Sequence, residues 1–206
     1  MKMHGYDWLA PFYDTLARVV VGKQIQQMQL PMLRHLHDRK KLLVLGGGTG
    51  WILPHIFRVN PNLVIHYVDS SEKMIARARS NAHGNKSIQF IQGTETAIST
   101  NDYDAVLTYF YLDMFAPAQL TTLITKLKNH LVKEARWLVC DFESQTRMHR
   151  IKVQVMYLFF RIVTGLRTNT LPAWYCVLTQ SGCIVLEDAY SADRFIRSAV
   201  FRVNIT

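Results

Sequence analysis

The sequence predicts an α/β protein whose core is a doubly wound, mostly parallel sheet of seven strands. From residue 41 onward, short strand-like runs alternate with stretches of helical length, which is the pattern of successive βαβ units. One apolar run passes directly into a glycine-rich loop at residues 42–50, the kind of position where open α/β sheets bind ligands. Both observations predict a binding cleft at the carboxyl edge of a parallel sheet.

Seven runs have the length and composition of strands. They are residues 42–45, 63–68, 88–91, 105–109, 136–141, 184–190 and 195–203. Helices are expected at residues 51–58, 72–82 and 118–131. Residues 93–100 are too short and polar for more than a turn or two.

Further helices are expected before and after this core. Residues 6–34 are helical in pattern, broken near Gly22 and at Pro31, and form an N-terminal helical cap. After the fifth strand, residues 145–163 form a long basic and aromatic helix, and residues 171–180 form another. We expect one domain over residues 1–206, with a cap at 1–40, a ligand-binding core at 41–142 and a C-terminal part at 143–206.

Composition narrows the classes of function. The chain has 206 residues, 49% hydrophobic and 19% charged, as a folded domain requires. Lys and Arg outnumber Asp and Glu by 24 to 15, which favours an anionic partner, but there is no basic tail of the kind that binds nucleic acid. The three cysteines, Cys140, Cys176 and Cys183, lack metal-ligand spacing, so we expect neither a disulfide framework nor a metal site. Since no secretion signal or membrane span is evident, a cytoplasmic protein is expected.

The most informative segment is the glycine loop, Gly46-Gly47-Gly48-Thr49-Gly50. Glycine provides backbone angles that a Cβ disfavours and lets a ligand approach the main chain. A P-loop would continue with Gly-Lys-Ser/Thr, but Trp51 and Ile52 follow here. The dinucleotide fingerprint requires a small residue where Trp51 stands. What remains is the spacing Gly46-x-Gly48-x-Gly50, or else a plain tight turn without a ligand.

An acid ends the second strand. Asp69 follows the glycines by about 20 residues, a position from which a carboxylate can accept both hydroxyls of a ribose. Alternatively, Asp69 is the N-cap of the next helix, although Ser70 or Ser71 could take that role. In combination with the glycine loop, a ribose-containing ligand is the favoured interpretation.

These motifs resemble those of class I S-adenosylmethionine-dependent methyltransferases. The glycine loop resembles the first motif of that family, and residues 67–79 resemble the second, more specific motif. Residues 6–14 resemble the opening cap of its ubiquinone/menaquinone-biosynthesis branch. The resemblance implies a Rossmann-like fold with a terminal antiparallel strand. It also implies S-adenosyl-L-methionine as the cofactor and S-adenosyl-L-homocysteine as the product.

The resemblance further implies a cofactor site around the glycine loop. The glycines would pack under the methionine and ribose parts, and Asp69 would bind the ribose hydroxyls. Ser70 and Met74 would lie beside the adenine, and Thr94 or Glu95 would face its amino group. The implied cofactor-binding residues are Tyr13, Gly46, Gly48, Gly50, Asp69, Ser70, Met74, Thr94, Glu95 and Tyr109.

Two positions depart from the family pattern. Family members usually carry an acid two residues before the first motif glycine, where this chain has Val44. Thr94 replaces the Asp of the third motif and offers only a hydroxyl. An alternative function is therefore a catalytically inactive domain that binds the cofactor.

Methyl transfer from a sulfonium is an in-line displacement, so the protein mainly aligns the reactants and excludes water. Asp113 and His149 are candidate general bases, with the alternative that His149 is a solvated residue of a basic helix. The acceptor pocket is expected to be apolar and aromatic, which suits a small, flat, hydrophobic acceptor; alternatively, its aromatic stripe is ordinary core. The expected pocket residues are Trp8, Tyr111, Asp113, Met156, Tyr157 and Phe160.

Contact with an anionic membrane surface is a further alternative. Basic residues border the apolar stripe of the helix at 145–163, as they do in interfacial helices. They are Arg147, Arg150, Lys152, Arg161 and Arg167. The sequence leaves a monomer and a homodimer both open.

Overall fold

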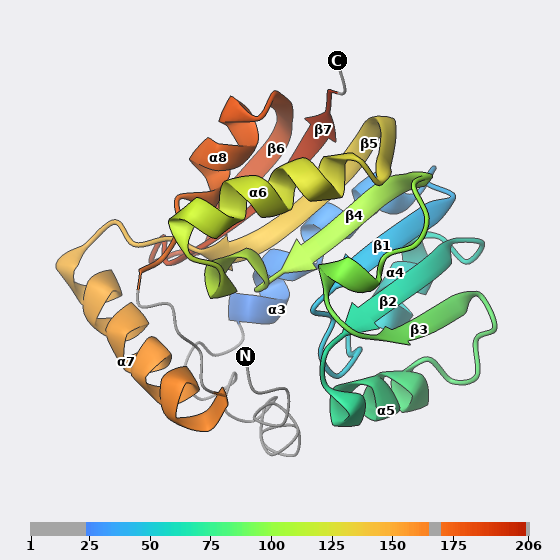
Figure 1. Cartoon of the computed structure of the whole chain (residues 1–206), viewed down its shortest axis with the longest axis horizontal. Helices are drawn as coiled ribbons and strands as arrows, with labels where there is room; N and C mark the ends of the chain where they lie inside the picture. Colours follow the sequence, from blue (N-terminus) through green and yellow to red (C-terminus); the bar gives the residue numbers. More distant parts are fainter. Residues whose placement is uncertain (1–23, 165–169, 205–206) are drawn as a thin grey trace.

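The computed structural model describes residues 24–164 and 170–204, which form a seven-stranded sheet with helices on both faces (Figure 1). The strand order is β3-β2-β1-β4-β5-β7-β6. Strands β1 to β5 are parallel, and β7 runs antiparallel to both of its neighbours, β5 and β6. The predicted doubly wound sheet with a terminal antiparallel strand is confirmed.

All seven predicted strands are present. They are β1 (Lys41–Leu45), β2 (Val64–Asp69), β3 (Ile88–Gln92), β4 (Tyr103–Tyr109), β5 (Leu131–Phe142), β6 (Cys183–Tyr190) and β7 (Ile196–Val203). Only β5 departs clearly from its predicted bounds, because it begins at Leu131. Its pairing with β4 shifts register before Arg136, and Glu134 has a φ of 65°. This bulge interrupts the alternation by which a strand is recognised in a sequence.

Within the described residues the helices lie close to their predicted positions, whereas residues 6–23 of the predicted N-terminal cap lie outside that range. They are α3 (Gln24–Gln29), α4 (Leu53–Val59), α5 (Glu72–Asn81), α6 (Pro117–Lys128), α7 (Arg147–Thr164) and α8 (Trp174–Gln180), with 3-10 turns η1 (Pro31–Leu36), η2 (Glu95–Ala97) and η3 (Leu112–Met114). Pro31 and Pro117 begin their elements, where a missing N–H costs no hydrogen bond. In the described ranges, none of the helices has both the length and the hydropathy needed to cross a bilayer.

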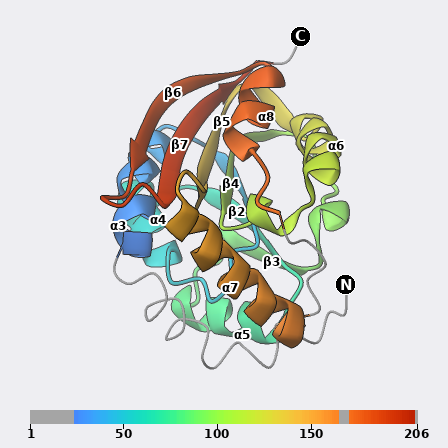
Figure 2. The ribbon, with the colours of Figure 1, turned by 90° about the vertical axis from the view of Figure 1, so that its left-hand side faces the viewer.

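The sheet separates two hydrophobic layers. On β1, Leu42 and Val44 pack into the layer that includes η1, α4 and α5, whereas Leu43 and Leu45 pack against α6 and α8. Figure 2 shows the sheet between α3 and α4 on one side and α6 and α8 on the other. Helix α7 follows β5 and lies beyond the carboxyl ends of the strands (Figures 1 and 2). The carboxyl edge of the sheet therefore lies between the two helical layers and α7.

Candidate functional site

The glycine loop connects β1 to α4 at the carboxyl edge of the sheet. Gly46, Gly48 and Gly50 have φ angles of 63°, 63° and 74°, in the left-handed region that a Cβ disfavours. A Cβ added to Gly48 would meet no atom of the described residues within 4 Å, so the loop faces open space there. A ligand can therefore approach the main chain closely at Gly48.

The opposite side of the loop is tightly packed. A Cβ on Gly47 would lie 2.2 Å from the Tyr67 Cζ atom, and one on Gly50 would lie 2.8 Å from Ala78 of α5. The Tyr67 hydroxyl also donates a hydrogen bond to the Gly48 carbonyl oxygen at 3.0 Å. The glycines thus permit close packing beneath the loop and leave space above it.

Asp69, at the end of β2, is fixed beside this space. Its Oδ2 accepts a hydrogen bond from the Gly48 N–H at 2.8 Å, and its Oδ1 accepts one from the Ser71 N–H at 2.9 Å. The N-cap of α5 is Ser71, whose Oγ accepts from the Met74 N–H at 3.2 Å. The alternative that Asp69 caps α5 is therefore wrong, and its carboxylate belongs to the glycine loop.

Of the two candidates after β3, Glu95 is connected to the glycine loop. The Thr94 hydroxyl instead caps η2 by accepting from the Thr96 N–H at 3.4 Å. Glu95 Oε2 accepts a hydrogen bond from the Tyr111 hydroxyl at 2.9 Å. The Tyr111 ring lies against Gly46, where an added Cβ would be 2.5 Å from the Tyr111 Cδ2 atom.

Tyr109, the last residue of β4, and Tyr111, two residues later, point to opposite layers. The hydroxyl of Tyr109 donates to the Gln29 carbonyl of α3 at 3.0 Å, and its side chain is part of the core. Phe110 has a φ of 51°, rare for a bulky residue, and turns the chain between them. The expected role of Tyr109 in cofactor binding stays a prediction, whereas Tyr111 is the tyrosine that lies against the glycine loop. Burial, together with the Glu95 and Asp69 charges, raises the pKa of Tyr111, so its hydroxyl stays a donor.

Two carboxyl groups are buried together after β4 and near the end of β5. Asp141 Oδ2 accepts hydrogen bonds from the Leu112 and Asp113 N–H groups at 3.1 and 3.2 Å. Asp141 Oδ1 accepts another from the Phe142 N–H at 2.8 Å. The buried Asp113 Oδ1 has no hydrogen-bond partner within residues 24–164 and 170–204.

Burial raises the pKa of both carboxyl groups. Burial raises the pKa of Asp113 to about 7. Burial and then the Asp113 charge raise the pKa of Asp141. A carboxyl that titrates near neutrality can exchange a proton at physiological pH. Asp141 was not predicted as a site residue, because it ends an expected strand. The signal that could have found it is an acid at the carboxyl end of β5, the strand that pairs with β4.

Helix α7 closes the site with its inward face. Tyr157 donates its hydroxyl proton to the Asp113 carbonyl oxygen at 2.9 Å, and Met156 is buried beside it in the sequence. His149 is also buried, so the interpretation of this residue as solvated is wrong. Its Nδ1 accepts from the Gln145 N–H at 3.3 Å, and its ring packs on Phe195 at 5.2 Å. Since its accepting nitrogen is engaged, His149 is a weaker candidate base than Asp113.

Other predicted positions contribute differently. Val44 is fully buried in the core, so a packing residue stands where an acid was expected. Ser70 follows Asp69 in the turn between β2 and α5, whereas Met74 is a buried residue in the first turn of α5. Trp8, Tyr13 and the side chain of Phe160 lie outside the described residues.

The chain is similar in sequence to a known protein family and to two relatives. Residues 42–134 match the family described as "Methyltransferase domain", a range that runs from the glycine loop past Asp113. Carboxy-S-adenosyl-L-methionine synthase of Nautilia profundicola is 24% identical over 151 residues, covering 71% of this chain and 64% of the relative. Malonyl-[acyl-carrier protein] O-methyltransferase of Bacillus cytotoxicus is 27% identical over 143 residues, covering 67% of this chain and 49% of the relative. The chain therefore spans less than two thirds of either relative.

Solved structures share the fold. The complex of DhpI with SAH superposes with a TM-score of 0.71 at 16% identity, covering 100% of this chain and 96% of DhpI. At this identity the likeness concerns the fold, including the order of strands that brings the glycine loop, Asp69 and Asp113 to one edge.

Proposed function

We propose that this chain is a class I S-adenosylmethionine-dependent methyltransferase that transfers the cofactor's methyl group directly to a small hydrophobic or aromatic acceptor. The observation that carries the proposal is the cradle at Gly48. Its main chain faces open space, and its N–H is bonded to the carboxylate of Asp69. This combination suits a ligand whose ribose approaches both groups.

The charges near the cradle suit a cationic cofactor. The chain has a formal net charge of +9, yet two acids, Asp69 and Glu95, lie at the glycine loop or are connected to it by hydrogen bonds. S-adenosylmethionine carries a sulfonium and an ammonium, so two acids at this place in a basic protein favour its binding. These acids can compensate for the charged contact that Val44 does not provide.

Each part of the site has a role in the proposed reaction. Asp69 binds the ribose, Glu95 with Ser70 and Met74 faces the adenine, and Tyr111 packs over the glycine loop. When bound, the cofactor supplies a methyl group already activated by the sulfonium, so no nucleophilic side chain is required. Asp113 accepts the proton of an oxygen or carbon acceptor, and Asp141 holds the segment that carries Asp113 by hydrogen bonds to its N–H groups. Tyr111, Met156 and Tyr157 line the acceptor side and exclude water.

Two measurements test this function. Isothermal titration calorimetry should show one molecule of S-adenosylmethionine or S-adenosylhomocysteine bound per chain. Incubation with cofactor labelled in the methyl group should then transfer label to small molecules extracted from the source cells. Absence of binding at millimolar cofactor by folded protein contradicts the proposal. Binding without any transfer of label identifies the chain as an inactive cofactor-binding domain, the alternative that Val44 and Thr94 favour.

Gly48→Ala should lower cofactor affinity at least tenfold, because the new methyl group would occupy the space that faces the loop. Gly84→Ala is a matched control. Gly84 has a φ of 75°, and its added Cβ would also meet no atom within 4 Å, so both variants carry a similar backbone strain of about 1–2 kcal/mol. Calorimetry should show that only Gly48→Ala binds cofactor weakly; equal affinity of the two variants would remove Gly48 from the site.

Asp69→Asn should weaken cofactor binding by about 1–3 kcal/mol, because an amide cannot accept both ribose hydroxyls with full charge assistance. Asp104→Asn provides the control. Asp104 also accepts two backbone N–H groups, from Lys40 at 2.8 Å and Lys41 at 2.9 Å, but at the amino end of β1. Both substitutions weaken hydrogen bonds from backbone N–H groups. Calorimetry should nevertheless find reduced cofactor affinity only for Asp69→Asn. An unchanged dissociation constant for this variant would assign Asp69 a purely structural role.

A further inference from the structure

The outward face of α7 carries an exposed apolar stripe. Met148, Ile151, Val155 and Leu158 are 62%, 54%, 64% and 56% exposed. These four are the most exposed large apolar side chains in the described part of the chain. Their spacing of three and four residues aligns them along one side of the helix. Soluble domains rarely leave such a contiguous stripe in water.

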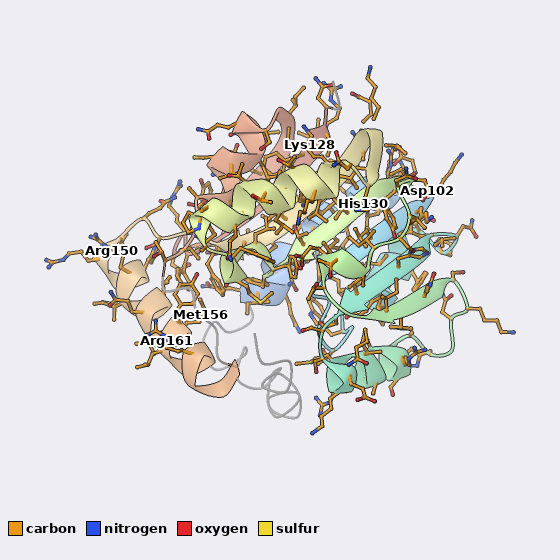
Figure 3. All side chains as sticks on the ribbon, in the orientation of Figure 1. Asp102, Lys128, His130, Arg150, Met156 and Arg161 are labelled. Carbon is orange, nitrogen blue, oxygen red and sulfur yellow. The ribbon has the colours of Figure 1, made fainter. Side chains whose placement is uncertain are left out.

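The stripe has positive charge along both borders. At about 100° per residue, the four apolar side chains occupy a sector of about 80°. Beyond one border lie Arg147, Arg161 and, farther round, Arg150, and beyond the other lies Lys152, whose Nζ is also paired with Asp193 at 3.1 Å. The helix contains no Asp or Glu. Figure 3 shows Arg150 and Arg161 on the outer side of α7 and Met156 on the side toward the sheet. The helix thus presents an apolar centre between basic margins.

We propose that α7 docks this protein on an anionic lipid surface. Helices that lie in a membrane interface combine an apolar face, which enters the boundary of the acyl chains, with basic margins that meet anionic headgroups. A second copy of the chain is a poorer occupant, because two such faces would bring their arginines together. The surface is independent of the Gly48 cradle, although the inward face of the same helix contacts Asp113 through Tyr157. Docking by α7 would therefore bring the acceptor side close to a lipid phase.

Vesicle flotation of the full-length protein tests the proposal. Protein should float with vesicles made of equal parts phosphatidylcholine and phosphatidylglycerol, and not with phosphatidylcholine alone. High salt should release it, because screening weakens its attraction to the headgroups. No flotation with anionic vesicles, or equal flotation with both kinds, overturns the proposal.

Matched variants identify the surface. Val155→Glu should reduce vesicle partitioning at least tenfold, because it replaces an inserted side chain with an anion. Val64→Glu introduces the same change at a 43% exposed valine that begins β2, and should bind like the parent. Arg150→Gln should reduce partitioning about fivefold, the contribution of one basic residue near an anionic surface, whereas Arg58→Gln on α4 should not.

The same variants distinguish docking on lipid from misfolding and from self-association. Circular dichroism and thermal unfolding show whether each variant is folded, and Arg150→Gln remains informative if Val155→Glu is not. Equal binding of the α7 variants and their controls contradicts the proposal. A concentration-dependent dimer that Val155→Glu abolishes, with no binding of the parent to vesicles, would assign the stripe to a second copy. Flotation is measured without cofactor, so its failure leaves the methyl-transfer proposal intact.

Discussion

Asp113→Asn is expected to stabilise the folded protein at pH 8 by roughly 4 kcal/mol and to leave its stability near pH 4 almost unchanged. Burial raises the pKa of Asp113 from its usual 3.8 to about 7. Below pH 4, this carboxyl is protonated in both the folded and the unfolded chain. Between pH 4 and pH 7 the unfolded chain releases the proton and the folded chain retains it, so the stability of the parent falls with rising pH. Because asparagine does not titrate, the variant does not lose stability in this pH range.

Urea unfolding at a series of pH values measures the effect as the difference in unfolding free energy between variant and parent. The difference should grow from pH 4 through pH 7, and a difference that does not change with pH would contradict the proposed titration. Asp38→Asn provides a control of opposite sign. A hydrogen bond from Arg39 lowers the pKa of Asp38 to about 2, so its contribution is present above its usual pKa and disappears as the pH falls through 2.

The parts of the fold that follow local patterns were predictable from the sequence. Apolar runs bounded by helical stretches identified all seven strands, and glycine at positions 46, 48 and 50 identified the cradle, because only glycine readily adopts its left-handed angles. The start of β5 was not predictable, because the bulge at Glu134 depends on pairing with β4. Local sequence carries little information on such an irregularity.

The arrangement of Tyr111, Asp113 and Asp141 could not be predicted without the structure. The strained angle at Phe110 decides that Tyr111, and not Tyr109, lies at the glycine loop, and no sequence signal marks a positive φ at a phenylalanine. The carboxyl pair likewise depends on two segments that meet only in the folded sheet. Asp113 could be named from its position after the fourth strand, but its raised pKa follows from burial beside Asp141.

Asp113→Asn should also lower the rate of methyl transfer by roughly 10²–10⁴-fold, the usual contribution of a positioned general base. Cofactor affinity should remain that of the parent, because the change lies outside the Gly48 cradle. Transfer of labelled methyl groups to an acceptor fraction, measured across pH, provides the readout. The parental rate should rise through about pH 7 as Asp113 ionises, and the variant should lack this rise.

Tyr157→Phe is the control for positioning. It removes only the hydroxyl that donates to the Asp113 carbonyl oxygen, so its rate should fall less and its pH profile should keep the parental shape.

An Asp113→Asn enzyme with the parental rate and profile would exclude Asp113 as the base. Methyl transfer would then go to an acceptor that is nucleophilic without losing a proton first. A thioether or an unprotonated amine has that property, because its lone pair can attack the methyl group directly. The effect of Asp113→Asn on the rate of methyl transfer therefore distinguishes two classes of acceptor. A rate that depends on the carboxylate indicates an oxygen or carbon acceptor, and a rate that does not depend on it indicates a sulfur or nitrogen acceptor.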